Sequence, residues 1–265
     1  LEIIFKRLEA VNLKLKPSKC CLLKREVNFL GHTVSSEGIG ADPEKSRAIE
    51  QWPEPRSIKD IRIFLGLCSY YRKLVKDFAQ KAAPMYELLK KNRRFEWTSE
   101  CHQSFLTLKS CLTHPPILSM PIDDGQYILD TDCSGQAAGA VLSQVQNGEE
   151  KVIAYASRSL SKSEKNYCIT RQELLSVVFF VKYFRCYLLG RQFKLRTDHA
   201  ALRWLRSTPE PIGQQSRWLE ILEEFSFDIE HRPGRLHTNA DAMSRMPCRQ
   251  CGMETDLSSR SIQVL

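Results

Sequence analysis

Apolar positions in the second half of the chain fall into short runs, which predicts a β-sheet with helices around it. The predicted strands are Tyr127–Thr131, Gly139–Gln144, Val152–Arg158, Phe193–Asp198 and Phe227–His231. A long helix is predicted over Glu164–Leu189, which is apolar around much of its circumference and is followed by Gly190. Shorter helices are predicted over Ala200–Arg206, Gly213–Phe225 and Thr238–Arg245. Together these elements predict an α/β fold with a five-stranded mixed sheet and flanking helices.

The first half is predicted to be mostly helical. Apolar residues at helical spacing, capping sequences and prolines divide it into segments. Helices are predicted over Leu1–Leu15, from Asp42 to Trp52, over Ile61–Val75, over Lys76–Leu89 with a new start at Pro84, and over Ser99–Leu112. Two short strands, Lys19–Leu23 and Glu26–Val34, and a turn at Glu37–Gly40 are predicted between the first two helices. The run His114-Pro-Pro116 ends the helical part and is the expected domain boundary.

Charge is distributed unevenly along the chain. Residues 1–120 hold 21 Lys and Arg against 13 Asp and Glu, so the whole formal net charge of +8 lies there and the remainder is neutral. A basic half suits a polyanionic partner such as nucleic acid, although a solvated basic surface explains the charge equally well. The ten cysteines lack disulfide-framework spacing, and no apolar run is long enough to span a bilayer or resembles a signal peptide. We therefore expect an intracellular protein, cytoplasmic or nuclear, with no membrane partner.

Two carboxylates stand one residue apart at the end of the first predicted strand of the sheet. Strand side chains alternate between faces, so Asp130 and Asp132 are expected to point the same way. The first strand, the long helix and the fourth strand make a β-α-β unit, whose right-handed crossover places the two strands parallel and adjacent. Both strands end in Thr-Asp, so Asp132 and Asp198 are expected at one edge of the sheet, where ligand sites gather. Glu173 on the long helix and Asp241 on the closing helix are within reach of that edge.

Each carboxylate also has an ordinary structural explanation. Asp132 could simply end a strand, and Glu173 could complete a capping box begun by Thr170. Asp198 could cap the following helix, and Asp241 could offset the dipole of its own helix. Four carboxylates in one place would nevertheless repel one another without cations. Their convergence would therefore form a site for hard divalent metals, Mg²⁺ or Mn²⁺.

Several longer motifs occur in order along the chain. In the second half they are Thr131-Asp132-Cys-Ser, Ala154-Tyr-Ala-Ser-Arg-Ser-Leu-Ser161, Thr170-Arg-Gln-Glu173-Leu, Arg196-Thr-Asp198-His-Ala, His231-Arg-Pro-Gly and Asn239-Ala-Asp241-Ala-Met-Ser-Arg245. This series closely resembles the RNase H domain of gypsy-class LTR-retrotransposon reverse transcriptases. Upstream, Phe29-Leu-Gly-His32 is similar to the primer-grip segment at the end of the polymerase palm. Phe64-Leu-Gly-Leu and Tyr70-Tyr-Arg72 are similar to the thumb, so that the resemblance covers about residues 1–247.

The resemblance implies a segment of a Pol polyprotein that contains an RNase H-like fold. It implies a palm remnant with a primer-grip-like segment at 1–40, a helical thumb and connection at 41–120, an RNase H domain at 121–247 and a linker tail at 248–265. The implied partners are an RNA–DNA hybrid and the rest of the polyprotein, namely the polymerase palm and fingers and the integrase. In the tail, Cys248-Arg-Gln-Cys251 is a single CxxC without a second pair, so we do not expect a structural zinc there.

The activity that the resemblance implies is an endonuclease that cuts the RNA strand of RNA–DNA hybrids. Asp132, Glu173, Asp198 and Asp241 match the family's Asp-Glu-Asp-Asp set, which holds two Mg²⁺ ions and accepts Mn²⁺ as a substitute. By the same comparison the metal ligand is Asp132 rather than Asp130. One ion would activate the attacking water and the other would stabilise the leaving oxygen.

Further residues are expected around this site. Either His231 or His237 assists proton transfer or product release, and a core or turn histidine explains each of them equally well. The residues expected to contact nucleic acid are Leu30, Gly31, Ser134, Arg158, Arg171, Gln172 and His199. Among these, His199 could instead cap its helix, and surface solubility accounts for the two arginines and the glutamine equally well.

The sequence departs from the family pattern in two places. Cys133 stands where the family usually has Ala, and we expect little effect from this small residue beyond a sensitivity to oxidation. The polymerase's Tyr-x-Asp-Asp turn does not occur, since Asp123-Asp124 follows Pro-Ile and lies in the wrong region. The chain by itself is therefore not expected to polymerise DNA.

Two other hypotheses remain open. Transposases and integrases share the fold, but they use Asp, Asp and then Glu, whereas the order here is Asp, Glu, Asp, Asp. A truncated or host-adopted remnant that binds nucleic acid without cutting it is the second alternative. The four intact acids argue only weakly against such a remnant, because a recent truncation would also keep them.

Overall fold

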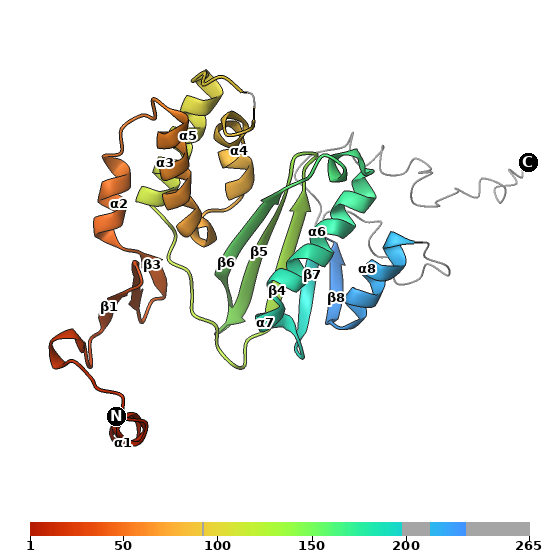
Figure 1. The fold of residues 1–265 in the computed structure, drawn as a ribbon. Helices are drawn as coiled ribbons and strands as arrows, with labels where there is room; N and C mark the ends of the chain where they lie inside the picture. The colour runs from red at the N-terminus through yellow and green to blue at the C-terminus, as the bar shows by residue number, and fades with distance from the viewer. Residues whose placement is uncertain (92, 198–212, 232–265) are drawn as a thin grey trace, which may run out of the picture.

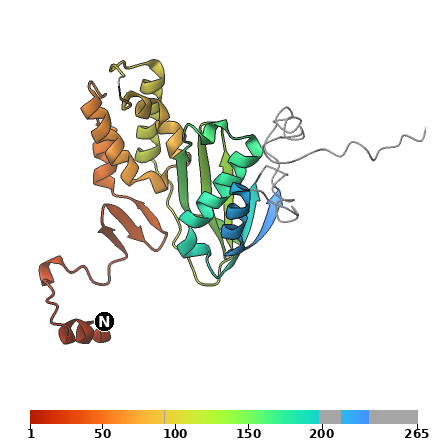
Figure 2. The same ribbon diagram turned by 45° about the vertical axis from the view of Figure 1, so that its right-hand side comes forward.

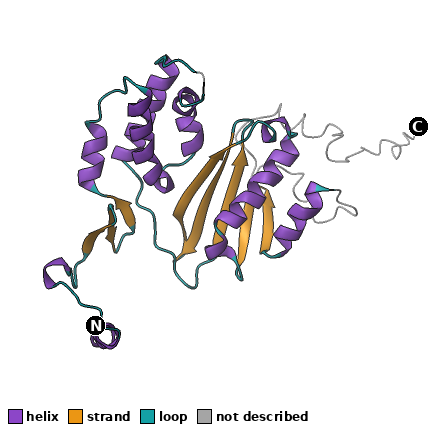
Figure 3. Cartoon of the chain, viewed as in Figure 1, coloured by secondary structure: helices purple, strands orange, loops and turns teal. Residues whose placement is uncertain are grey.

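The computed structural model describes residues 1–91, 93–197 and 213–231 (Figures 1 and 3). This part of the chain contains two hydrophobic cores. The first elements are α1 Glu2–Ala10, β1 Glu26–Phe29, β2 His32–Ser35, β3 Ile39–Ala41, α2 Pro43–Glu50, α3 Ile58–Tyr70, α4 Phe78–Leu88 and α5 Ser99–Thr113. They are followed by β4 Tyr127–Cys133, β5 Ala137–Gln146, β6 Glu149–Ser159, α6 Ile169–Tyr183, α7 Arg185–Leu188, β7 Gln192–Thr197, α8 Gln214–Glu223 and β8 Ser226–His231. Short 3-10 helices lie at Pro17–Lys19, Arg72–Leu74 and Glu164–Asn166. Hereafter α2–α5 are called the helical unit, and β4–β8 with α6–α8 are called the sheet unit.

The sheet unit has the predicted architecture. Its five strands run in the order β6-β5-β4-β7-β8, with antiparallel pairing from β6 to β4 and parallel pairing from β4 to β8. Helices α6 and α8 lie on the same face of this sheet (Figure 2). The mixed five-stranded sheet and the parallel, adjacent placement of β4 and β7 confirm two predictions from the sequence.

The alternation of side chains along β4 positions the candidate site. Tyr127 and Leu129 are buried under α6, where they join the core around Phe180. Asp130 and Asp132 occupy the alternate positions of the strand, and their exposure increases towards the strand end. The prediction that the two aspartates share a face is therefore consistent with this burial pattern.

Side-chain caps precede two helices of the helical unit. The Asp42 carboxylate accepts a hydrogen bond from the Glu44 amide before α2, and the Ser57 hydroxyl accepts one from the Asp60 amide before α3. One prediction for this unit is wrong, because Pro84 lies inside α4 rather than at a new helix start. The buried neighbours of Pro84 pack into the core and offset the backbone hydrogen bond that proline cannot donate.

Three other sequence predictions need correction. Lys19–Leu23 is not a strand, since its first residue ends a 3-10 helix and the rest is irregular. Glu26–Val34 is a β-hairpin rather than one strand, because two residues with positive φ turn the chain between β1 and β2. The long helix predicted over Glu164–Leu189 is divided: Glu164–Asn166 is a 3-10 helix, α6 runs over Ile169–Tyr183, and the chain bends at the buried Phe184 before α7.

The helical unit packs against β6, the edge strand of the sheet. Ser157 on β6 is central to this contact: its hydroxyl accepts a hydrogen bond from the Ala79 amide at 2.9 Å, and its carbonyl accepts one from the Arg72 guanidinium. Val152 and Tyr155 of the same strand pack against the core of the helical unit. This packing covers an edge of the sheet that would otherwise present unpaired backbone groups. Among the described helices, none has both the length and the apolar character that crossing a bilayer requires.

Candidate active site

Asp132 lies near the end of β4, next to the turn that connects β4 to β5. It is exposed at the end of β4 and is paired in register with Gly139 of β5. The turn between the strands is closed by Ser134, whose hydroxyl donates to the Ala137 carbonyl at 2.9 Å and accepts from the Ala137 amide at 3.1 Å. The Asp-Cys-Ser motif therefore places a solvent-accessible carboxylate beside a hydrogen-bonded turn. Nucleic-acid contact by Ser134 remains a prediction.

Glu173 lies on α6, which packs on one face of the sheet. It lies in the second turn of α6, the helix that packs across β4, and only 3% of it is exposed. The charges of both acids affect the pKa of the Cys133 thiol. Burial raises the pKa of the Cys133 thiol to about 12, and the negative charges of Glu173 and Asp132 add to that rise. Glu173 therefore lies near enough to the end of β4 for its charge to affect Cys133, and its convergence with Asp132 on a metal ion remains a prediction.

A polar network fixes the segment that leads into α6. The Arg158 guanidinium lies 2.6 Å from one Glu164 carboxylate oxygen, and the Ser161 amide donates to the other at 2.7 Å. Burial alone would raise the pKa of Glu164, but the hydrogen bonds from Arg158 and Ser161 outweigh it and hold this pKa below its ordinary value. The side-chain amide Nε2 of Gln172 donates to the backbone carbonyls of Glu164 and Lys165 at 3.3 and 3.2 Å. This network holds the first turn of α6 against the end of β6.

The residues predicted to contact nucleic acid near this helix have internal partners. The Arg158 guanidinium also lies over the Phe179 ring, 4.7 Å from its centroid. Arg171 lies over the Tyr167 ring and donates to the Gln214 side chain at 3.0 Å, which links α6 to α8. Gln172 is buried. These contacts give all three side chains a structural role, and their contact with nucleic acid remains a prediction.

One side of the site comes from the helical unit, which the sequence did not indicate. A small cleft is lined by Asp77, Gln80, Asp132, Ser134, Ala137, Ala138, Gly139 and Ser157. Asp77 has left-handed backbone angles, φ 54° and ψ 36°, at the start of α4. Its carboxylate lies so close to Gly139 that a Cβ there would come within 2.6 Å of Asp77 Oδ1. No local pattern signals this contact, because it depends on how the two units pack.

Four of the predicted site residues, Asp198, His199, His237 and Asp241, lie outside the described residues. Strand β7 ends at Thr197, next to β4 in the sheet. His231 ends β8, where its backbone is paired with Thr197. Within the described ranges, no group of three or more histidine, cysteine, aspartate or glutamate side chains has the spacing of a metal site. Of the four predicted carboxylates, the structure describes Asp132 at the end of β4 and Glu173 on α6, the helix that packs across β4, and their convergence on one metal site remains a prediction.

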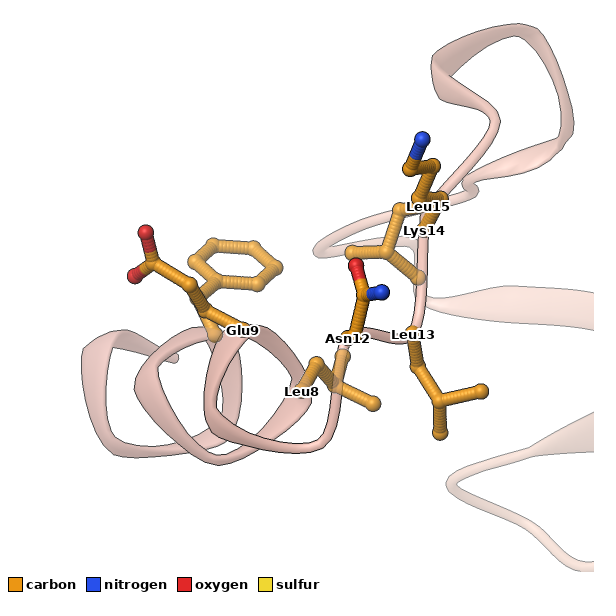
Figure 4. Close-up of a pocket in the computed structure, with 7 residues that line it drawn as sticks. Leu8, Glu9, Asn12, Leu13, Lys14 and Leu15 are labelled. Carbon is orange, nitrogen blue, oxygen red and sulfur yellow. The ribbon is translucent and has the colours of Figure 1, made fainter.

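The remaining predicted contact residues, Leu30 and Gly31, lie at the tip of the β1–β2 hairpin, in the part of the chain before the helical unit. A further hollow lies at the N-terminal end, between α1 and the segment that follows it (Figure 4). Leucine side chains and Phe5 make up most of its lining, with Glu9, Asn12 and Lys14 as the polar members. This hollow contains none of the predicted site residues.

The chemistry of the two described carboxylates fits a hard divalent cation. Both offer oxygen ligands, which Mg²⁺ and Mn²⁺ prefer. One acid is exposed to solvent and the other is nearly fully buried, and both charges raise the pKa of the same thiol. A bound cation would offset the negative charge of these carboxylates. A divalent ion therefore suits this edge of the sheet.

The fold of the sheet unit is RNase H-like, and comparison with known proteins agrees. Residues 123–225 match the family described as the RNase H-like domain found in reverse transcriptase. Two solved structures of a foamy viral protease-reverse transcriptase share the fold. One, in complex with double-stranded DNA, has a TM-score of 0.74 at 23% identity and covers 88% of this chain and 42% of that chain. The other, in complex with an RNA/DNA hybrid, has a TM-score of 0.73 at 20% identity and covers 100% and 36%.

Similarity in sequence extends over both units. The chain is 42% identical over 247 residues to the retrovirus-related Pol polyprotein from transposon 297 of Drosophila melanogaster, with 93% of this chain and 23% of the relative covered. It is 39% identical to that from transposon 412 of the same organism, with 93% and 20% covered. It is 34% identical to the transposon Tf2-3 polyprotein of Schizosaccharomyces pombe, with 92% and 19% covered. The chain thus corresponds to a segment of retrotransposon Pol polyproteins that contains an RNase H-like domain, and it spans about a fifth of the length of these relatives.

Proposed function

We propose that this chain is an RNase H-type endonuclease that cleaves the RNA strand of RNA–DNA hybrids by metal-assisted hydrolysis. The observation that carries the proposal is the position of Asp132 at the end of β4, beside the parallel strand β7 and under α6, the helix that contains Glu173, in an RNase H-like sheet. Ligand sites in such sheets form at the carboxyl ends of adjacent parallel strands. The foamy viral relative of the same fold in complex with an RNA/DNA hybrid supports the choice of substrate.

Asp132 and Glu173, with Asp198 and Asp241, would hold two Mg²⁺ ions, and Mn²⁺ would substitute for them. When bound, such ions supply an activated water and stabilise the leaving oxygen of a phosphodiester. Asp132 is exposed, so this carboxylate can lie next to a substrate phosphate. Glu173 is buried and is held by a helix whose start is fixed by the Arg158–Glu164 network, so its position changes little when substrate binds. Either His231 or His237 would assist proton transfer or product release.

The basic first half would serve as the track for the hybrid backbone. All of the net charge of +8 lies in residues 1–120, and the phosphate backbone dominates affinity for nucleic acids. In this assignment residues 1–40 are the end of a polymerase palm, 41–120 a thumb and connection, 121–247 the nuclease domain and 248–265 a linker. The remaining partners are the polymerase palm and fingers and the integrase of the polyprotein. The relatives named above, which are Pol polyproteins, support this assignment.

Cleavage of a hybrid whose RNA and DNA strands carry different end labels tests the proposal. The wild-type chain is expected to cut only the RNA in Mg²⁺, and a chelator is expected to stop the reaction. Asp132→Asn should abolish cutting, whereas Asp130→Asn, on the same strand and two residues away, should retain it. A folded wild-type chain that binds the hybrid without cutting it would contradict the proposal. That result would favour the alternative, a remnant that binds nucleic acid without catalysis.

A further inference from the structure

The hairpin tip that contains Leu30 and Gly31 has an unusual backbone. The two residues join β1 to β2 as a two-residue turn, with φ values of 49° and 70°. Such a turn suits the twist of a hairpin, but a left-handed conformation is unfavourable for a leucine. Leu30 is also 70% exposed, and the neighbouring Phe29 is 62% exposed, so burial of their side chains does not hold the turn in place. Something else must stabilise this conformation.

Two consecutive tyrosines at the end of α3 supply that support. The Tyr70 hydroxyl donates a hydrogen bond to the Leu30 carbonyl, and the Tyr71 hydroxyl donates one to the Gly31 carbonyl at 2.8 Å. The rings also enclose His32, whose ring is stacked on Tyr70 at 5.5 Å and lies edge-on to Tyr71 at 5.4 Å. Each tyrosine thus contributes one hydrogen bond from its hydroxyl and one ring contact with His32. Together they connect the hairpin tip to a helix 40 residues further along the chain.

The hydrogen bond to the Leu30 carbonyl fixes the orientation of the Leu30–Gly31 peptide group and therefore the direction of the Gly31 N–H. In a trans peptide the carbonyl and the following N–H point in opposite directions. Because the Leu30 carbonyl faces Tyr70, the Gly31 N–H faces away from α3. Within the described part of the chain, this N–H donates to no other group. An outward backbone N–H at an exposed turn is a suitable donor for a phosphate oxygen.

We propose that Tyr70 and Tyr71 are positioning residues for nucleic-acid binding, because their hydroxyls hold the Leu30–Gly31 turn with its free N–H directed at the phosphate backbone. This inference rests on the proposed function, which makes an RNA–DNA hybrid the ligand. It assigns the tyrosines no part in the chemistry. Their removal should therefore weaken the binding of the hybrid and leave the rate of bond cleavage unchanged.

The test replaces each tyrosine by phenylalanine, which keeps the ring against His32 and removes only the hydroxyl. Tyr86→Phe is the matched control, because the Tyr86 hydroxyl lies 3.1 Å from the Ser69 hydroxyl, so its hydrogen bond is within the helical unit and does not involve the hairpin carbonyls. Binding of a labelled hybrid is measured by fluorescence anisotropy, and kcat and KM are measured for cleavage. We expect Tyr70→Phe and Tyr71→Phe each to raise Kd and KM roughly threefold and the double variant roughly tenfold. The control and every kcat should stay at the wild-type value.

A second measurement separates positioning from a merely structural role. Gly31→Ala places a Cβ 3.2 Å from the Tyr71 hydroxyl oxygen at a φ of 70°, so it distorts the same turn. If the turn is the point of contact, the effects of Gly31→Ala and Tyr71→Phe on Kd should not add, whereas those of Gly31→Ala and Tyr86→Phe should.

Three results would overturn the inference. The first is hybrid binding by both phenylalanine variants that equals that of Tyr86→Phe, and the second is additive effects in the first pair of substitutions. The third is a parallel loss of kcat and thermal stability, which would assign the tyrosines to the fold alone. A wild-type chain that binds hybrid but does not cut it would refute the nuclease and still leave the anisotropy comparison valid.

Discussion

The Arg158–Glu164 pair allows a quantitative test of how the start of α6 is held. Its charged atoms are 2.6 Å apart, and the two side chains are 24% and 17% exposed. An exposed pair contributes about 0.2–1 kcal/mol, whereas breaking a fully buried pair costs about 3–5 kcal/mol. This pair lies between those limits, and Glu164 also accepts the Ser161 amide. Glu164→Gln should therefore lower the free energy of unfolding by about 2 kcal/mol at neutral pH.

The pH dependence of this effect follows from the lowered pKa of Glu164. The carboxylate has an ordinary value of 4.5, and its pKa is lower in the folded chain. A group of this kind stabilises the fold above its unfolded pKa and loses that stabilisation as the pH falls through the folded pKa. The difference between wild type and Glu164→Gln should therefore be greatest at pH 7. It should start to shrink below pH 4.5.

Urea unfolding followed by circular dichroism at pH 7 and at acid pH measures this difference. Glu149→Gln is the matched control, because Glu149 is 76% exposed and lies 3.7 Å from Lys151, and this substitution should change stability by less than about 0.5 kcal/mol. A loss at Glu164 no larger than that of the control, or a loss that is the same at both pH values, would refute the reasoning.

Two further substitutions test the contacts that hold the chain together. Gly38→Ala should cost about 2–4 kcal/mol in urea unfolding, because at a φ of 141° its Cβ would lie 2.1 Å from the Leu118 carbonyl oxygen. Gly40→Ala, with no atom within 4 Å, should stay within about 0.5 kcal/mol, and equal effects would contradict the account. Ser157→Ala should lower the free energy of unfolding by about 1–2 kcal/mol, because the Ala79 amide loses its acceptor between the two units. An unchanged urea midpoint for Ser157→Ala would show that this hydrogen bond does not stabilise the packing.

The parts of the fold that could be predicted from the sequence depend on local patterns and on chirality. Alternating apolar residues and the β-α-β order were enough to place β4 beside β7 in parallel, because right-handed crossovers are nearly universal. Capping sequences helped to divide the first half into helices because a cap depends on one side chain and one nearby amide, as the structure shows at Asp42 and Ser57. The same topology places Asp132 at the end of β4 under α6, the helix that contains Glu173.

The parts that could not be predicted depend on contacts between distant segments. The Leu30–Gly31 turn lacks the Asn-Gly or Asp-Gly sequence typical of two-residue hairpins, and it is held by hydroxyls that lie far away in the sequence. Pro84 was expected to start a helix because local rules do not include the core that packs around it. The position of Asp77 beside Gly139 depends on the packing of the helical unit against the sheet. In each case tertiary packing decided a question that local sequence leaves open.

The measurement that tests the central claim most directly is the single-turnover rate of RNA cleavage by Asp132→Asn, Glu173→Gln and the double variant. If the two carboxylates act together on one pair of metal ions, each single substitution should slow cleavage on the order of 10³-fold or more, and the double should be little slower. Circular dichroism checks that each variant is folded. A Glu173→Gln variant that cuts at the wild-type rate, or two losses that multiply in the double, would show that these carboxylates do not form one catalytic site.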